Sequence, residues 1–140
     1  VFDSFNNGYY AGLNNSDELF IQESNLIKDL ADKESCVIVG RCADFILKDK
    51  RNVLKIFVSS SMENKIKRAT EFYHMDKENA EKEIARINKL RSNHYEYYTE
   101  RGWETPSNYD ICVNSDSIGI NNVVDLICSI VEKSKELAIK

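Results

Sequence analysis

Three short apolar runs set the strongest limit on how this chain can fold. They are rich in β-branched residues, which is typical of strands buried on both faces of a parallel sheet. The runs are Cys36–Val39, Val53–Val58 and Tyr109–Val113. Helix-length segments separate them, as crossovers between parallel strands require. The sequence therefore predicts an α/β fold, a parallel sheet flanked by helices on both faces.

Apolar periodicity and capping residues predict the helices. A Ser16–Asp17 cap precedes the first apolar stripe. The sequence Ser60–Glu63 matches a capping box, and Asp76 is suited to cap the following helix. The expected helices span about 17–33, 43–48, 62–74 and 77–100, and a closing helix is striped by Val123, Val124, Leu126, Ile127, Ile130 and Val131.

Two segments show neither the helical period nor the alternating period of strands. Residues 1–16 are expected to form a loop or docking segment, and residues 114–120 a polar loop. With no internal repeat and no linker, residues 1–140 are expected to form a single domain. Because three short strands make a thin sheet, either the sheet is small or further strands lie outside this sequence.

The charge balance argues against some classes of function. The chain has 19 Lys and Arg against 23 Asp and Glu, a net charge of -4. Nucleic acids and anionic membranes need a positive footprint, so neither is expected as a partner. No apolar run approaches the roughly 20 residues of a membrane span, and the N-terminus lacks a signal-peptide pattern. We expect a soluble, cytoplasmic protein.

The cysteines favour reduced thiols over a disulfide framework. Three of them, Cys36, Cys112 and Cys128, lie inside apolar runs, where a thiol behaves as a small buried hydrophobe. No C-x-x-C spacing occurs, and the two histidines lie on different expected segments, so zinc has little support. An intracellular protein with free thiols is therefore the favoured interpretation.

The first candidate site directly follows the run Cys36–Val39. Ligands of open α/β sheets bind outside the carboxyl ends of the strands. Gly40 allows a close turn, Arg41 offers a planar fork suited to phosphate, and Asp44 is placed to orient that arginine or accept from a sugar hydroxyl. An ordinary strand-end ion pair is the alternative, and position alone leaves both open.

The second candidate is a series of cations over residues 62–100. Arg86 and Lys89 share a helix face, whereas Arg91 lies about 140° round from Arg86. Interleaved glutamates favour a solvated, salt-bridged helix on pattern alone. The alternative is a mobile arm that brings arginine to a transferring phosphoryl group. The series comprises Lys67, Arg68, Lys82, Arg86, Lys89 and Arg91.

Two further segments contain residues suited to a nucleotide site. The aromatic stretch His94–Tyr98, followed by Trp103, favours packing over base stacking, and His94 is not expected to be catalytic. Asn114–Ser117 follows a strand, where it either lines a nucleotide pocket or turns the chain. The 140 residues contain no G-x-x-x-x-G-K-[ST], G-x-G-x-x-G, G-x-S-x-G or H-E-x-x-H motif.

Taken together, these strings resemble the cytidylate kinase-like family of nucleoside monophosphate kinases. The resemblance covers nearly the whole chain, and the combination is far more specific than any one string. It rests on Asn7–Leu13, Cys36–Asp44, Leu54–Val58 with Ser61–Arg68, Ala80–Arg91, His94–Thr99 and Asn108–Ser115.

The resemblance implies a P-loop fold with a helical lid over about 62–100. It implies transfer of the γ-phosphoryl group of ATP, with Mg²⁺, to CMP or dCMP. Arg41 matches the arginine that grips the acceptor phosphate, with Asp44 as its neighbour. Only for Arg91 does the resemblance reverse the preference for a solvated cation; Lys82 stays solvated.

The remaining residue roles also come from the resemblance. The expected lid cations that meet the phosphoryl group are Arg91, Arg86 and Lys89. The loop at 115–118, with Ser115 and Ser117, is expected near the ATP base, and Arg68 is also expected to bind the cofactor. Asn88 departs from the aspartate of similar proteins, which predicts a weaker ion pair within the lid.

A second departure concerns the family's first strand and P-loop, which are not among these 140 residues. The absent strand is expected between the runs at 36–39 and 53–58. The chain is thus expected to be the carboxyl-terminal two-thirds of a kinase-like polypeptide, inactive alone. The alternatives are a non-catalytic nucleotide-binding or regulatory protein and a phosphotransferase for another small acceptor. The acceptor base and the oligomeric state stay open.

Overall fold

The computed structural model describes the backbone of residues 15–138 and the side chains of residues 15–134. The segment 1–14, expected to be a loop or docking segment, lies outside the described residues. Two compact units make up the chain, residues 1–53 and residues 54–140.

The described part of the first unit contains two helices, α1 (Asn15–Lys33) and α2 (Ala43–Ile46). They share a small apolar core built from Ile27 of α1 with Ala43 and Leu47. Ile38 and Val53 pack against this cluster from the connecting segments. From the apolar stripe that predicts α1, Ile27 and Ala31 pack in this core, whereas Leu19, Leu26 and Leu30 are exposed.

The run Cys36–Val39 is not a strand in this structure, which corrects the first of the three expected strands. Val37 and Val39 are 93% and 88% exposed, whereas Ile38 between them is half-buried. The alternating exposure follows the two-residue period of extended backbone. A strand also needs a partner for its N–H and C=O groups, and no described segment pairs with this one.

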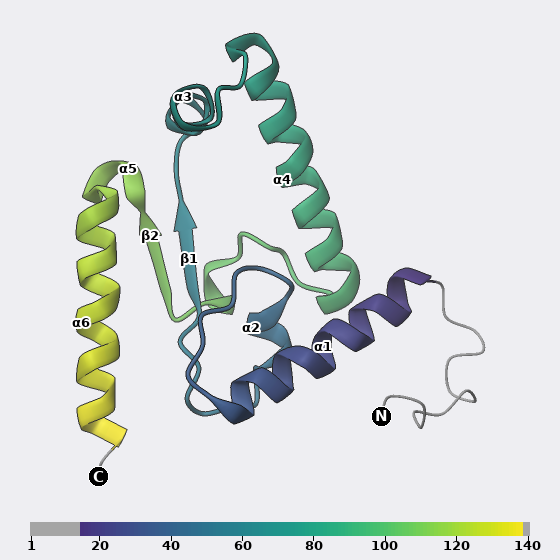
Figure 1. Cartoon of the computed structure of the whole chain (residues 1–140), viewed down its shortest axis with the longest axis vertical. Helices are drawn as coiled ribbons and strands as arrows, with labels where there is room; N and C mark the ends of the chain where they lie inside the picture. The colour runs from purple at the N-terminus through teal and green to yellow at the C-terminus, as the bar shows by residue number, and fades with distance from the viewer. Residues whose placement is uncertain (1–14, 139–140) are drawn as a thin grey trace. The chain divides into compact units, whose positions relative to one another are not determined.

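The second unit is built on two parallel strands, β1 (Ile56–Ser59) and β2 (Ile111–Asn114). Their register pairs Ile56 with Ile111 and Ser59 with Asn114. Both strands therefore end at the same edge, and α5 follows β2 directly (Figure 1). The other elements are α3 (Met62–Tyr73), α4 (Lys77–Thr99), the 3₁₀ helix η1 (Pro106–Asn108), α5 (Ser115–Ile118) and α6 (Ile120–Ala138).

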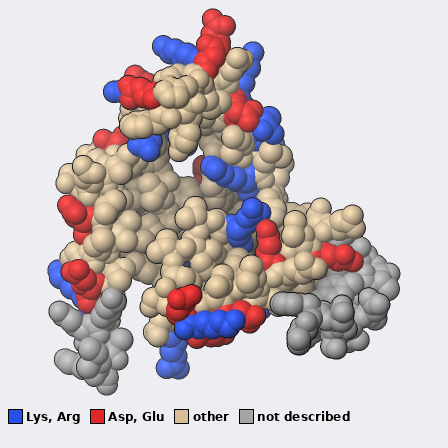
Figure 2. All heavy atoms as spheres, viewed as in Figure 1, with Lys and Arg blue, Asp and Glu red and all other residues tan. Residues whose placement is uncertain are grey.

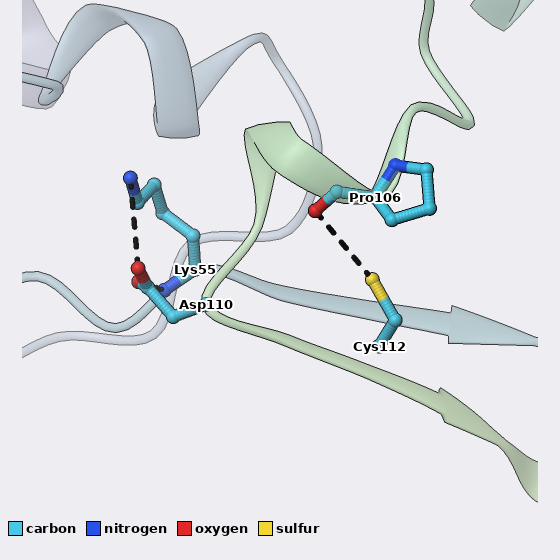
Figure 3. Close-up of polar contacts among 4 residues, drawn as sticks. All are labelled: Lys55, Pro106, Asp110 and Cys112. Carbon is cyan, nitrogen blue, oxygen red and sulfur yellow. Dashed lines mark hydrogen bonds and ion pairs between the residues drawn. The ribbon is translucent and has the colours of Figure 1, made fainter.

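Lys55 and Asp110 fix the register at the start of the strand pair (Figure 3). The Lys55 backbone N–H donates to the Asp110 carboxylate at 2.8 Å, and the N–H of Asp110 donates to the Lys55 carbonyl at 2.9 Å. The Lys55 ammonium also lies 3.7 Å from the other carboxylate oxygen. A one-residue slip would break this reciprocal pair, so it specifies the observed register.

Helices α3 and α4 pack against each other as a hairpin. Small residues make the contact close, since Ala69 of α3 and Ala80 of α4 are both buried. Both helices begin where the sequence predicts, but the α3 cap is Ser61, whose hydroxyl oxygen accepts from the Asn64 N–H at 3.2 Å. Asp76 is the N-cap residue of α4, but its side chain makes no capping hydrogen bond.

Aromatic side chains connect the end of α4 to the strands. Phe57 of β1 lies 5.8 Å from the Trp103 ring and 5.0 Å from the Tyr109 ring, centroid to centroid. The Tyr109 hydroxyl donates to the Trp103 carbonyl at 2.6 Å. Tyr95 is buried, whereas Tyr97 is 64% exposed. Packing therefore explains part of the aromatic stretch.

The burial expected for three cysteines is wrong. Cys36, Cys112 and Cys128 are exposed, and Cys42 is the buried one, although all four are free thiols. Cys36 lies in the unpaired run, and Cys112 is exposed on β2, where its thiol lies 4.0 Å from the Pro106 carbonyl (Figure 3). The expected loop at 114–120 contains the short helix α5.

No helix among the described residues has both the length and the apolar character needed to cross a lipid bilayer.

Candidate functional site: a pocket at the carboxyl ends of the strands

A pocket of about 570 Å³ lies at the edge where β1 and β2 both end. The turn into α3, the α3 helix, α5 and the start of α6 form its walls. This is the side of a parallel sheet where ligands of α/β proteins bind. The lining residues are Ser60, Asn64, Lys67, Arg68, Glu71, Phe72, Ser115, Asp116, Gly119, Ile120, Asn121 and Asn122.

Serine hydroxyls extend the strand pairing beyond the last backbone hydrogen bonds. Ser59 donates its hydroxyl to the Val113 carbonyl at 3.1 Å, and Ser115 donates to the Ser59 carbonyl at 3.0 Å. The two chain segments that leave the sheet therefore stay together at the base of the pocket.

Asp116 makes the strongest link between these segments. One carboxylate oxygen accepts from the Ser60 hydroxyl at 2.7 Å, and the other accepts from the Ser61 backbone N–H at 2.6 Å. These hydrogen bonds hold the pKa of Asp116 well below its ordinary value. The Ser60 hydroxyl has the largest effect, and the Ser61 backbone N–H has the next largest. The pocket therefore contains a fixed negative charge whose oxygens already accept from the protein.

The α3 wall supplies cations and an aromatic ring. Lys67 and Arg68 both line the pocket, and the Arg68 guanidinium lies over the Phe72 ring, 5.3 Å from its centroid. Such a contact orients the flat guanidinium group. Glu71 lies on the same wall, so the pocket combines charges of both signs.

The α6 wall begins at a glycine. Gly119 has φ +84°, a conformation that residues with a Cβ rarely adopt, and its carbonyl accepts from the Val123 N–H at 3.0 Å. This turn starts α6 beside the strands and brings the amides of Asn121 and Asn122 to the pocket. The Asn122 amide itself donates to the Ile118 carbonyl at 2.8 Å.

The structure brings together two of the three residues expected to bind the cofactor. Arg68 and Ser115 both line the pocket. Ser117 is exposed on α5 and lies outside the lining set. Their role in binding a nucleotide stays a prediction.

The expected lid cations lie on α4. Arg86 makes a bidentate pair with Glu83, with N–O distances of 2.8 and 2.6 Å, and this pair raises the pKa of Arg86. Lys89 and Arg91 are exposed on the same helix. Where α3 and α4 lie, at the top of the view, basic and acidic side chains are interspersed (Figure 2).

Arg41 and Asp44 belong to the first unit. Arg41 makes an ion pair with Glu23 of α1, at 3.1 Å, and its side chain is 63% exposed. Asp44 is half-buried in the first turn of α2. Gly40, Arg41 and Cys42 have φ values of 72°, 57° and 54°, so three consecutive residues are left-handed.

That conformation carries strain at Arg41 and Cys42, since a left-handed residue with a Cβ costs roughly 1–2 kcal/mol. Strained backbone of this kind clusters at ligand sites. The roles expected for Arg41 and Arg91 in phosphoryl transfer stay a prediction, and the two residues lie in different units.

A known protein family and a solved structure are similar to this chain. The cytidylate kinase-like family matches residues 2–117 of this chain. The chain belongs to the cytidylate kinase-like family. This confirms the family that the sequence motifs indicate. No curated protein matches the chain.

A solved structure supports the fold of this cytidylate kinase-like chain. It is the crystal structure of an uncharacterized protein from Eubacterium ventriosum, with a TM-score of 0.79 and 29% sequence identity. The match covers 86% of this chain and 69% of that chain. The similarity therefore extends over most of both proteins.

Sequence reasoning missed several residues of the pocket. It named the Asn114–Ser117 segment but gave Asp116 no role, and it did not single out Phe72 or the amides of Asn121 and Asn122. Glu23, the partner of Arg41, was also missed. The signal available for Asp116 was its place in a polar segment at the carboxyl end of a strand. No sequence pattern indicated the other missed residues.

Proposed function

We propose that this protein is an ATP-dependent nucleoside monophosphate kinase that transfers a phosphoryl group from ATP to CMP or dCMP. Membership in the cytidylate kinase-like family is the observation that carries the proposal. The pocket at the strand ends supports it, because it offers Lys67 and Arg68 on one wall and polar groups on the other. In this proposal the pocket takes the base end of ATP.

The residues of the chain act by positioning and by neutralising charge, without a covalent intermediate. Arg41 binds the acceptor phosphate through its planar fork. Arg91, with Arg86 and Lys89, meets the phosphoryl oxygens during transfer. Arg86 must leave its pair with Glu83 to do so, which makes Arg91 and Lys89 the readier cations.

Mg²⁺ accompanies ATP in reactions of this class and neutralises charge on the phosphates. Among the described residues, no group of three or more His, Cys, Asp or Glu side chains is arranged to hold a metal ion. We therefore assign no Mg²⁺ ligand among the described residues.

The direct test is a coupled assay of the full-length protein with ATP and Mg²⁺ against CMP, dCMP, UMP and AMP. The expected result is turnover with CMP and dCMP. Turnover with UMP or AMP alone would show that CMP and dCMP are not the acceptors. Transfer to a different small molecule would show that the protein is another phosphotransferase.

A second candidate is nucleotide binding without transfer. One observation favours it: Arg86, an expected lid cation, is held in a bidentate pair with Glu83, whereas Lys67 and Arg68 line the pocket. Binding of ATP without turnover of any acceptor in the coupled assay would support this regulatory or binding role over the kinase.

A further inference from the structure

The pocket depends on two chain segments that lie far apart in the sequence. One leaves β1 and becomes α3, which carries Lys67 and Arg68. The other leaves β2 and becomes α5. Asp116 contacts the first of these segments through both of its carboxylate oxygens.

Asp116 is itself held in a defined orientation. Its backbone N–H donates to the Asn114 side-chain carbonyl at 2.9 Å, while its carboxylate receives the Ser60 hydroxyl and the Ser61 N–H. Hydrogen bonds to a charged acceptor are about twice as strong as neutral ones. The Ser61 bond also falls at the cap of α3, where the backbone N–H groups have no partner within the helix.

The position of α3 sets the position of the cations. Arg68 is seven residues beyond Ser61, or roughly 10 Å along the helix axis. A swing of about 10° at the start of α3 would move Arg68 by about 2 Å, enough to break a hydrogen bond. Packing of α3 on α4 holds the two helices together but does not by itself fix them to the strands.

We propose that Asp116 is a positioning residue for nucleotide binding, which fixes the start of α3 against the end of β2 and so keeps Lys67 and Arg68 on the pocket wall. This inference rests on the proposed function, because it assigns the pocket to ATP. Asp116 acts through α3 and not by contact with the nucleotide.

The test compares Asp116→Ala with Asp125→Ala in the full-length protein. Asp125 is exposed on α6 outside the pocket, so its variant controls for the loss of one negative charge. For Asp116→Ala, which loses the hydrogen bonds from both Ser60 and Ser61, we expect the KM for ATP to rise about tenfold. The kcat at saturating ATP and the KM for the acceptor should change less than about threefold.

Hydrogen exchange supplies a second measurement without nucleotide. In Asp116→Ala the amides of Ser61 and of the first turn of α3 should exchange faster than in Asp125→Ala, because their tie to β2 is lost. Ser60→Ala removes one of the two bonds and should raise the KM for ATP by a smaller factor. It serves as the second variant where Asp116→Ala does not fold.

The outcomes separate the two proposals. Wild-type protein that binds no ATP overturns the proposed function and this inference with it. Wild-type protein that binds ATP, with a KM within twofold of wild type in Asp116→Ala or Ser60→Ala, overturns the positioning role alone. So does a loss in Asp116→Ala that Asp125→Ala matches, since charge and not position would then explain it.

Discussion

Arg41 has a backbone conformation that few arginines adopt. It lies between Gly40 and Cys42 in a left-handed stretch, and its side chain extends to Glu23. A glycine at this position would remove the strain, but it would also remove the guanidinium group. Arg41 is therefore the residue at which ligand binding and stability are expected to oppose each other.

Replacing Arg41 tests its role in acceptor binding. Arg41→Ala is expected to weaken the monophosphate acceptor by roughly 1.5–3 kcal/mol, the range for a hydrogen bond to a charged group, and to leave ATP binding nearly intact. Titration calorimetry with each nucleotide measures both. Unchanged acceptor affinity would remove Arg41 from the site.

Arg41→Gly is the matched control. It loses the same guanidinium group and the same pair with Glu23, but it relieves the left-handed backbone. Its free energy of unfolding should exceed that of Arg41→Ala by about 1 kcal/mol. Equal stability of the two variants would contradict the strain.

Arg91 should act on turnover more than on binding. Arg91→Ala is expected to lower kcat by about a hundredfold or more, as for a group engaged chiefly in the transition state. Lys82→Ala, on the same helix, should stay within about twofold because Lys82 is solvated. The measurement is steady-state kinetics of both variants, and equal losses would indicate a nonspecific charge effect.

Cys42 is the buried one of the four cysteines. Its side chain is 4% exposed, and burial, followed by the nearby Asp44 and Glu23 charges, raises its pKa from 9.0 to about 11. Folding therefore favours the neutral thiol of Cys42 over the thiolate. Its contribution to stability is complete below the unfolded pKa and is lost as the pH rises through about 11.

Two measurements check Cys42. At pH 8 an aromatic disulfide reagent should modify Cys36, Cys112 and Cys128 rapidly and Cys42 slowly. Between pH 9 and 11 the free energy of unfolding should fall, and Cys42→Ala should flatten that fall. Four equally fast thiols would show that Cys42 is accessible.

Among the elements, α3 depends most on its first residues. Ser61 caps it through the Asn64 N–H, and the Ser61 N–H bonds to Asp116. The side chain of Ser61 thus caps α3, while its backbone N–H bonds to Asp116, which lines the pocket. The neighbouring Ser60, which the capping-box pattern predicts as the cap, donates to Asp116.

Loss of the cap should be measurable. Ser61→Ala is expected to lower the free energy of unfolding by about 1 kcal/mol, the usual cost of losing an N-cap side chain. Ser134→Ala is the control, because that hydroxyl bonds back to the Ile130 carbonyl inside α6 and contributes little. Urea unfolding compares the variants, and equal midpoints would contradict the capping role.

Sequence reasoning succeeded where structure is local. It placed α1 at 17–33 and α4 at 77–100, against observed bounds of Asn15–Lys33 and Lys77–Thr99. Periodicity and caps act within a few residues, so the sequence carries them directly. The third run is likewise a strand, shifted to Ile111–Asn114.

Features that depend on distant segments were not predictable in the same way. The unpaired state of residues 36–39 depends on whether a partner strand is present, and the burial of Cys112 depends on what covers β2. The hydrogen bonds of Asp116 join it to Ser60 and Ser61, which lie 56 and 55 positions away in the sequence. No local pattern encodes a contact of that range, whereas the family motifs did point to Arg68 and Ser115.

At the scale of the whole molecule, the run at 36–39 is the most unusual surface. Val37 and Val39 are almost fully exposed, yet Ile38 packs into the first unit's core. Val37→Ala should change the free energy of unfolding by less than about 0.5 kcal/mol, as for other surface substitutions.

Ile38→Ala is the internal comparison, with an expected loss of about 1–2 kcal/mol for a half-buried side chain. Chemical unfolding of the 140-residue chain measures both variants. A loss for Val37→Ala that equals or exceeds that of Ile38→Ala would show that Val37 is covered in solution.

The parallel pairing of Ile56 with Ile111 also bears on how this chain reaches its native state. The intervening polypeptide must loop back before a single β1–β2 hydrogen bond forms, and such long closures slow folding. The α3–α4 hairpin lies inside that loop and can assemble earlier from neighbouring contacts. We therefore expect the pocket at the strand ends to form late in folding, once both strand ends have met.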